Sequence, residues 1–299
     1  MSSIKTSETF DSIYLKRRYR TIGILTFLLP FAGTLFTLYL LVMDRGVDTF
    51  FVVFLIVMYF LSVFGLEVGY HRYLSHNAFQ TSKTFRVILT ILGGMAASGP
   101  PIYWAATHRL HHKYSDKEKD PHSPHLFGDR LSDKLKGAWH AHIGWMINGQ
   151  ITNSVLLGKN LAKDATMRAL ERLYPFWILL GLVISATVGF IYTGDFKGML
   201  LGFFWGGPVR IFFVHLLYIG GLNSICHTFG VRDFKTNDQS RNTWWMALPT
   251  LGQGWHNNHH AFPHSAIVGI KWWQIDISGY IILLLKHSGL VWNVLEPDI

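Results

Sequence analysis

The sequence is short of cysteine and of charged residues. Its single cysteine, Cys226, excludes an internal disulfide framework, a four-cysteine zinc site and a cysteine-ligated iron–sulfur cluster within this chain. Only 15% of the 299 residues are charged, whereas soluble domains average about 25%. Together with 49% apolar residues, this shortage excludes a disordered chain and favours a membrane protein over a soluble globule.

Long uncharged runs predict where the chain crosses the membrane. At 1.5 Å per residue, a helix over 21–43 is long enough to cross a hydrocarbon core of about 30 Å. A charged link with Asp44, Arg45 and Asp48 leads to a second run, so the first two spans form a hairpin. We predict an all-α integral membrane protein with spans at about 21–43, 49–66, 173–194 and 198–222, the last with Arg210 facing protein or water.

The other segments are expected to form a tail and a helical cap on one side of the membrane. The run 87–107 is rich in glycine and proline and is read as re-entrant or interfacial, since a crossing there would separate two histidine clusters. Most of the Lys and Arg residues then lie on one side, which the positive-inside rule makes cytoplasmic. The prediction is one domain over 1–299, with a cytoplasmic tail at 1–20 and a cytoplasmic cap from 67–172 and 223–299.

The basic charge and the tryptophans fit this membrane arrangement. The formal charge of +9 is assigned to the cytoplasmic membrane face, and we expect no nucleic-acid partner. Several indole rings fall in the C-terminal part of the cap, where amphipathic helices on lipid headgroups would use them. These are Trp244, Trp245, Trp255, Trp272 and Trp273.

Histidine is the residue type that carries the chemistry. Half of the 16 histidines lie in three short motifs, HRYLSH, HRLHH and HNNHH. On a helix, positions i, i+3 and i+4 share one face, so each HxxHH motif can present three imidazoles to one side. His71 and His76 diverge by about 140° on a straight α-helix, so they need a bend between them or serve two metals. His227 and Asn223, in NSICH, are four residues apart and are candidates for a further ligand and a weaker contact.

The number of imidazoles exceeds what one metal takes, so two metals are expected just above the membrane. A nitrogen-rich shell suits iron, copper or zinc, and spacing does not choose among them. No serine nucleophile motif or phosphate-binding glycine loop accompanies the histidines. Oxidation of a lipid-dissolved substrate is the leading hypothesis.

The three motifs, with NSICH between the second and third and DPHSP after the second, resemble the integral-membrane fatty acid desaturases, in particular the delta-9 acyl desaturases related to stearoyl-CoA desaturase. The resemblance implies a non-haem di-iron centre that uses O₂ to place a cis double bond in a long acyl chain carried by CoA, acyl-carrier protein or a lipid. It implies an external electron donor such as a ferredoxin or a b-type cytochrome. It also implies iron ligation by His71, His76, His108, His111, His112, His227, His256, His259 and His260, with Asn223 holding a water on one iron.

Two positions depart from the family pattern. Gln253 stands before the third motif where a glutamate is expected, and Glu67 stands where related sequences often have an uncharged residue. Because outer carboxylates orient ligating imidazoles, one hypothesis is that Glu67 accepts the free ring N–H of His71. Asp116, Asp120, His122 and His264 lie near the motifs and are kept outside the ligand set.

Three alternatives remain open at this stage. A related membrane oxygenase would hydroxylate or ketolate a lipid or carotenoid with the same chemistry. A metal transporter would carry its ligands near the middle of the spans, whereas these lie beside the cap. A b-type haem protein would need only axial histidines and leaves the clustering unexplained.

Overall fold

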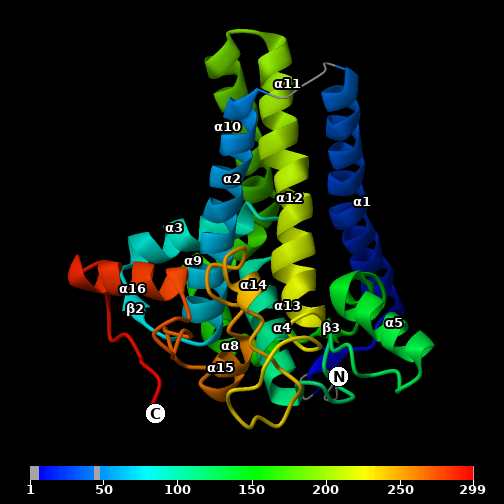
Figure 1. Cartoon of the computed structure of the whole chain (residues 1–299), viewed down its shortest axis with the longest axis vertical. Helices are drawn as coiled ribbons and strands as arrows, with labels where there is room; N and C mark the ends of the chain where they lie inside the picture. Colours follow the sequence, from blue (N-terminus) through cyan, green and yellow to red (C-terminus); the bar gives the residue numbers. More distant parts are fainter. Residues whose placement is uncertain (1–6, 44–47, 299) are drawn as a thin grey trace.

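The computed structural model describes residues 7–43 and 48–298, and its spans stand over a compact cap (Figure 1). Four described helices are long and apolar enough to cross a membrane, namely Ile13–Met43, Thr49–Ser75, Tyr174–Thr193 and Phe196–Ser224. This number and their order agree with the sequence prediction. The link at Asp44 and Arg45 and the first six residues lie outside the described residues.

The first two helices extend beyond the predicted spans. Helix α1 (Ile13–Met43) begins inside the segment expected to be a tail. Helix α2 (Thr49–Phe64) starts after Asp48, whose side chain accepts a hydrogen bond from the Phe50 N–H, and continues as π-helical turns over Gly65–Ser75. Those turns carry the first histidine motif out of the bundle as an extension of the second span.

The last two spans form a close pair. Helix α10 (Tyr174–Thr193) packs on α11 (Phe196–Phe204), where a Cβ on Gly189 would lie 2.1 Å from the Gly198 carbonyl oxygen, so glycine is required at this crossing. The fourth span continues through Trp205–Val209, α12 (Arg210–Phe213), Val214–Gly220 and α13 (Gly221–Ser224). Arg210 is fully buried and donates to Ser62 Oγ and to the carbonyls of Gly206 and Met95, so it faces protein as predicted.

The segment predicted to be re-entrant forms two shorter helices, α3 (Lys83–Gly94) and α4 (Pro101–Tyr114), neither of which is among the four spans. Helix α3 lies across the bundle (Figure 1). It approaches so closely that a Cβ on Gly65 would lie 2.2 Å from the Gly93 nitrogen. The flanking histidine motifs therefore stay on the same side of the bundle.

The rest of the cap is built from short helices and two small antiparallel sheets, so the all-α prediction holds apart from four two-residue strands. Strand β1 (Thr9–Phe10) pairs with β3 (Ile151–Thr152), and β2 (Gln80–Thr81) pairs with β4 (Val291–Trp292). The cap helices are α5 (Leu131–Trp139), π-helical His140–Gly144, α6 (Trp145–Asn148), α7 (Ser154–Leu157), α8 (Lys159–Lys163), α9 (Ala165–Arg172), α14 (Trp244–Ala247), α15 (His256–Ala261) and α16 (Ile277–His287).

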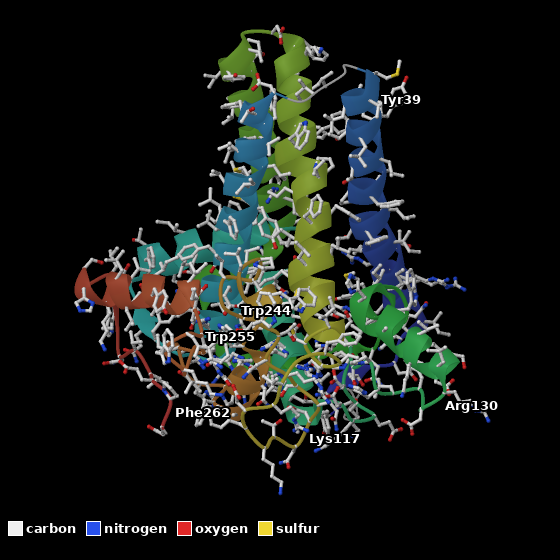
Figure 2. All side chains as sticks on the ribbon, in the orientation of Figure 1. Tyr39, Lys117, Arg130, Trp244, Trp255 and Phe262 are labelled. Atoms are coloured by element: carbon white, nitrogen blue, oxygen red, sulfur yellow. The ribbon has the colours of Figure 1, made fainter. Side chains whose placement is uncertain are left out.

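Exposure separates the five tryptophans expected at the headgroups. Trp244, Trp245, Trp272 and Trp273 are exposed, but Trp255 is buried and donates its indole N–H to the Ile275 carbonyl. The prediction for Trp255 was wrong because this residue immediately precedes the third histidine motif and packs inside the cap beneath it. Figure 2 shows Trp255 among the side chains of the cap and Trp244 nearer the spans.

Candidate metal centre

The three histidine motifs meet where the cap joins the second and fourth spans. The first motif lies on the π-helical extension of α2, the second on α4 and the third on α15. His227 follows the end of α13. Two groups of histidines each have their ring nitrogens within 4.8 Å of one another. Group A contains His71, His76, His108, His112 and His259, and group B contains His111, His227, His256 and His260.

The π-helical turns explain how His71 and His76 reach the same group. The His76 N–H bonds to the His71 carbonyl, five residues back, which is the π-helical pattern. Five residues make little more than one turn of this wider helix, so the two imidazoles point in similar directions. Of the two sequence-based options, a change in helix geometry is therefore the correct one, and the pair does not serve separate groups.

Each HxxHH motif is divided between the groups. His108 and His112, one turn apart, enter group A, whereas His111 enters group B. In the third motif His256 and His260 enter group B and His259 enters group A. Each motif thus gives an i, i+4 pair to one group and its third imidazole to the other, which holds the two groups side by side.

The nitrogen spacing fits metal ions. In group A the Nε2 atoms of His76 and His108 are 2.8 Å apart, and the Nε2 of His259 lies 2.9 Å from that of His112. In group B the Nε2 of His256 lies 3.0 Å from that of His227 and 3.2 Å from that of His260. Nitrogens bound at right angles to one metal at about 2.1 Å would be about 3 Å apart.

The protonation of these side chains also suits metal binding. Burial, with the neighbouring histidines, lowers the pKa of His108 and of His112 far below the usual value. A neutral imidazole is the form that ligates a metal. The residues therefore fit a nitrogen-ligated pair of metal ions, one in each group.

Carboxylates hold the outer nitrogens of three of the four histidines in group B. His111 Nδ1 lies 3.0 Å from Asp120, His227 Nδ1 lies 2.8 Å from Asp116, and His260 Nδ1 lies 2.7 Å from Asp238. Such contacts fix the tautomer and leave Nε2 free for a metal. The sequence analysis considered Asp116 and Asp120 because they follow the second motif, and it missed Asp238.

The pKa values of these carboxyls reflect the contacts. Burial alone would raise the pKa of Asp116, but His227 outweighs it and keeps that pKa well below the usual range. The same balance, with His111 for Asp120 and His260 for Asp238, lowers the other two pKa values. No sequence signal marks Asp238, because it lies in a loop outside every histidine motif.

Group A has a different surrounding. Glu67 Oε2 lies 3.2 Å from His71 Nδ1, so the carboxylate is beside the nitrogen that the sequence hypothesis names, and acceptance of its N–H stays a prediction. Glu67 Oε1 accepts a 2.7 Å hydrogen bond from Arg72. The Gln253 side-chain nitrogen lies 3.5 Å from His71 Nε2. Glu67 and Gln253 therefore lie beside the same imidazole.

A cavity of about 60 Å³ lies against both groups. Its lining includes His71 and His108 of group A, His111 and His256 of group B, and Asn223. Asn223 is thus placed beside the histidines. His122 also lines the cavity and packs on His111, and these two histidines with Asp120 form a third set that could hold a metal ion, outside groups A and B. His264 bonds through Nδ1 to the His76 carbonyl and belongs to none of the three sets.

Comparisons with known proteins agree with this geometry. The family model described as fatty acid desaturase matches residues 48–277. A hex-5-enoyl-(acyl-carrier protein) acetylenase from Moorena producens is 43% identical over 293 residues, covering 97% of this chain and 91% of the relative. An sn-1 stearoyl-lipid 9-desaturase from Anabaena variabilis is 37% identical, covering 78% of this chain and 79% of the relative.

A third relative, delta-9 acyl-lipid desaturase 2 from Arabidopsis thaliana, is 36% identical, covering 80% of this chain and 73% of the relative. The match therefore extends over most of the chain, from the second span through the third histidine motif. With its four apolar helices and its histidine groups, the chain belongs to the fatty acid desaturase family, as an integral membrane oxidoreductase that desaturates acyl chains.

Proposed function

We propose that the protein is an O₂-dependent acyl desaturase that places a cis double bond at two irons, one in each histidine group, within a single domain over residues 1–299. The observation that carries this proposal is the pair of groups, whose nitrogen spacing fits two metal ions at the edge of one cavity. The nine histidines of groups A and B are the proposed ligands, and Asn223 is the proposed holder of a water on one iron.

Two irons bound there would supply the O₂ and one-electron chemistry that removal of hydrogen from a methylene requires. The overall balance takes two hydrogens from adjacent methylenes, with O₂, two electrons and two protons, and yields two waters. Glu67 and the three aspartates lie beside the outer nitrogens of the imidazoles, and Trp104, Thr107 and Leu222 line the cavity in which the reacting carbons would lie.

The electrons come from a separate donor, such as a ferredoxin or a b-type cytochrome, because one cysteine cannot hold an iron–sulfur cluster. We place the cap, both termini and the metals in the cytoplasm on the basis of the positive-inside bias. Lys113, Lys117 and Lys119 are exposed near the second motif, and Figure 2 shows Lys117 on the side of the cap away from the spans. An acidic donor would be attracted to this surface.

Two positions are proposed for the new double bond. The resemblance and the names of two relatives favour delta-9 in a long acyl chain. The relative at 43% identity is named for a hex-5-enoyl chain, whose double bond is terminal, so oxidation close to the methyl end is the second candidate. Hydroxylation or ketolation of a lipid is less well supported, since the matches cited above are named as desaturases or as an acetylenase.

Gas chromatography of membrane fatty acids tests the proposal. A host without its own desaturase expresses the wild type, His111→Ala or His287→Ala, the last being a control at an exposed histidine of α16. We expect a new cis-monounsaturated acid with the wild type and with His287→Ala and none with His111→Ala. A purified wild-type protein without iron would contradict the proposal.

A further inference from the structure

A second, larger cavity adjoins the cavity beside the metals. It measures about 920 Å³, near the upper end of the roughly 300–1,000 Å³ typical of ligand pockets, and lies between α1, α4, α6 and α10. Four residues line both cavities: Ser98, Tyr103, Trp145 and Ile219. The two spaces therefore adjoin at these four residues, where an acyl chain in the larger cavity would come closest to groups A and B.

The charges around the larger cavity set the direction in which an acyl chain enters. Its lining includes exposed cations at the start of α1 and at the end of α9, namely Lys16, Arg17, Arg18, Arg20 and Arg172. A polar acyl head group stays beside these cations and water, because burying it without partners is costly. The methyl end therefore leads toward the metals.

Tyr218 bounds the cavity beside the metals and does not line the larger one. Its hydroxyl donates a 2.6 Å hydrogen bond to Glu67, which also accepts from Arg72. Arg72 in turn donates to Asp276 at 2.8 Å, and all four side chains are buried. The ring is thus held by a chain of buried polar contacts and forms a fixed wall.

The ring of Tyr218 packs in a cluster of buried apolar side chains. Tyr218 belongs to one buried cluster with Val63, Leu66 and Val214, from the second and fourth spans. Removal of the ring would extend the cavity into this apolar region, where further methylenes are accommodated at little cost.

The cavity volume limits how much of the chain lies beyond the reacting bond. One water-sized group needs about 10–15 Å³ of such volume, so about 60 Å³ holds at most roughly five, including any space that the metals take. A methylene is of similar size. Two positions are taken by the reacting carbons, which leaves about three for the carbons that follow them.

We propose that Tyr218 stops the methyl end of the acyl chain, so that the protein oxidises a bond within about three carbons of that end. This inference rests on the proposed desaturase function and narrows its substrate class to short chains, or to chains oxidised near the methyl end. A hexenoyl chain fits this limit, and a C18 chain oxidised at its middle does not.

The test varies Tyr218 and the chain length together. The desaturase-deficient host expresses each variant and receives saturated fatty acids from hexanoic to octadecanoic acid, and mass spectrometry locates each double bond. Tyr218→Ala and the milder Tyr218→Leu remove the ring. Tyr218→Phe keeps the ring and loses only the bond to Glu67.

With the wild type we expect double bonds near the methyl end and little product from the longest chains. Tyr218→Phe keeps the ring, so it should keep this bond position even where loss of the contact with Glu67 lowers the yield. Tyr218→Ala and Tyr218→Leu should move the bond away from the methyl end and accept longer chains. A binding readout accompanies this: without O₂, the melting temperature of the purified protein should rise with short chains in the wild type and with longer chains in Tyr218→Leu.

Two outcomes separate the inference from the function on which it rests. Mid-chain desaturation of octadecanoic acid by the wild type, unchanged in Tyr218→Leu, would overturn the inference and leave the desaturase function intact. No unsaturated product from any chain, with no iron in the purified protein, would overturn both.

Discussion

Because three aspartates contact histidines of group B, we predict that mutation of one aspartate weakens iron binding in group B and leaves iron binding in group A unchanged. Asp238 gives the sharpest case, because its carboxylate lies 2.7 Å from His260 Nδ1 and both side chains are buried. Ser240 and Thr236 hydroxyls donate to the other carboxylate oxygen and fix its orientation. Loss of Asp238 would leave the His260 ring free to turn or to change tautomer.

The expected magnitude follows from this contact. Loss of an outer partner of a ligating histidine costs about 10–100-fold in metal affinity, or roughly 1.4–2.7 kcal/mol. Asp238→Asn keeps a neutral acceptor and should lie near tenfold, since a charged acceptor is about twice as strong. Asp238→Ala removes the acceptor and should approach a hundredfold.

Titration of metal-free protein with ferrous iron, in competition with a chelator, measures the two sites. In both Asp238 variants group B should bind its iron with lower affinity, and group A should bind its iron as in the wild type. Glu67→Gln should instead lower the iron affinity of group A, because Glu67 contacts His71 of that group. Asp129→Asn, at an exposed aspartate, is the control. If Asp238→Ala lowers the iron affinity of both groups equally, or of neither, the assignment of His260 to a metal site in group B is wrong.

Three further predictions concern stability and the electron donor. Burial raises the pKa of Glu171 to about 7 from the usual 4.5, so the folded protein holds the extra proton between these values and loses stability as pH rises through them. The free energy of unfolding of Glu171→Gln should therefore rise relative to that of the wild type by up to about 3 kcal/mol as the pH goes from about 4.5 to about 7. This appears as a difference in melting temperature that grows with pH. Gly202→Ala places a Cβ 2.4 Å from the Ser185 carbonyl oxygen and should cost about 1–3 kcal/mol, whereas Val183→Ala on the exposed face of α10 should cost less, both by thermal unfolding in detergent. Reduction by an acidic donor should slow as salt rises, and a rate independent of ionic strength would count against electrostatic docking.

Local patterns predicted the spans and the histidines that come together. Long uncharged runs depend only on hydropathy, and the spacing of each HxxHH motif depends only on helix geometry. Local patterns could not predict that each motif is divided between two groups, because this division depends on how α4 and α15 face each other across the cap. His111 and His112 are adjacent in the chain and enter different groups.

Contacts from distant loops were the hardest to predict. Asp116 and Asp120 follow the second motif closely, so proximity alone brought them into consideration. Asp238 reaches His260 from a loop that precedes the third motif, and nothing in its local sequence distinguishes it from a solvated aspartate. Trp255 failed for a related reason, since a tryptophan suited to a headgroup surface is equally suited to a buried position.

Glu67 and Gln253, the two positions where the sequence analysis expected other residues, lie on opposite sides of one imidazole. Glu67 lies beside Nδ1 of His71, and Gln253 lies on the Nε2 side, which faces the other nitrogens of group A. A glutamate at 253 would place an oxygen donor and a negative charge on the metal side of this imidazole. In this chain the charge lies on the outer side, where it orients the ring without competing for the metal, and group A keeps five nitrogen donors. The same carboxylate accepts the hydrogen bond from Tyr218, so Glu67 couples the orientation of a proposed ligand to the proposed wall of the acyl site.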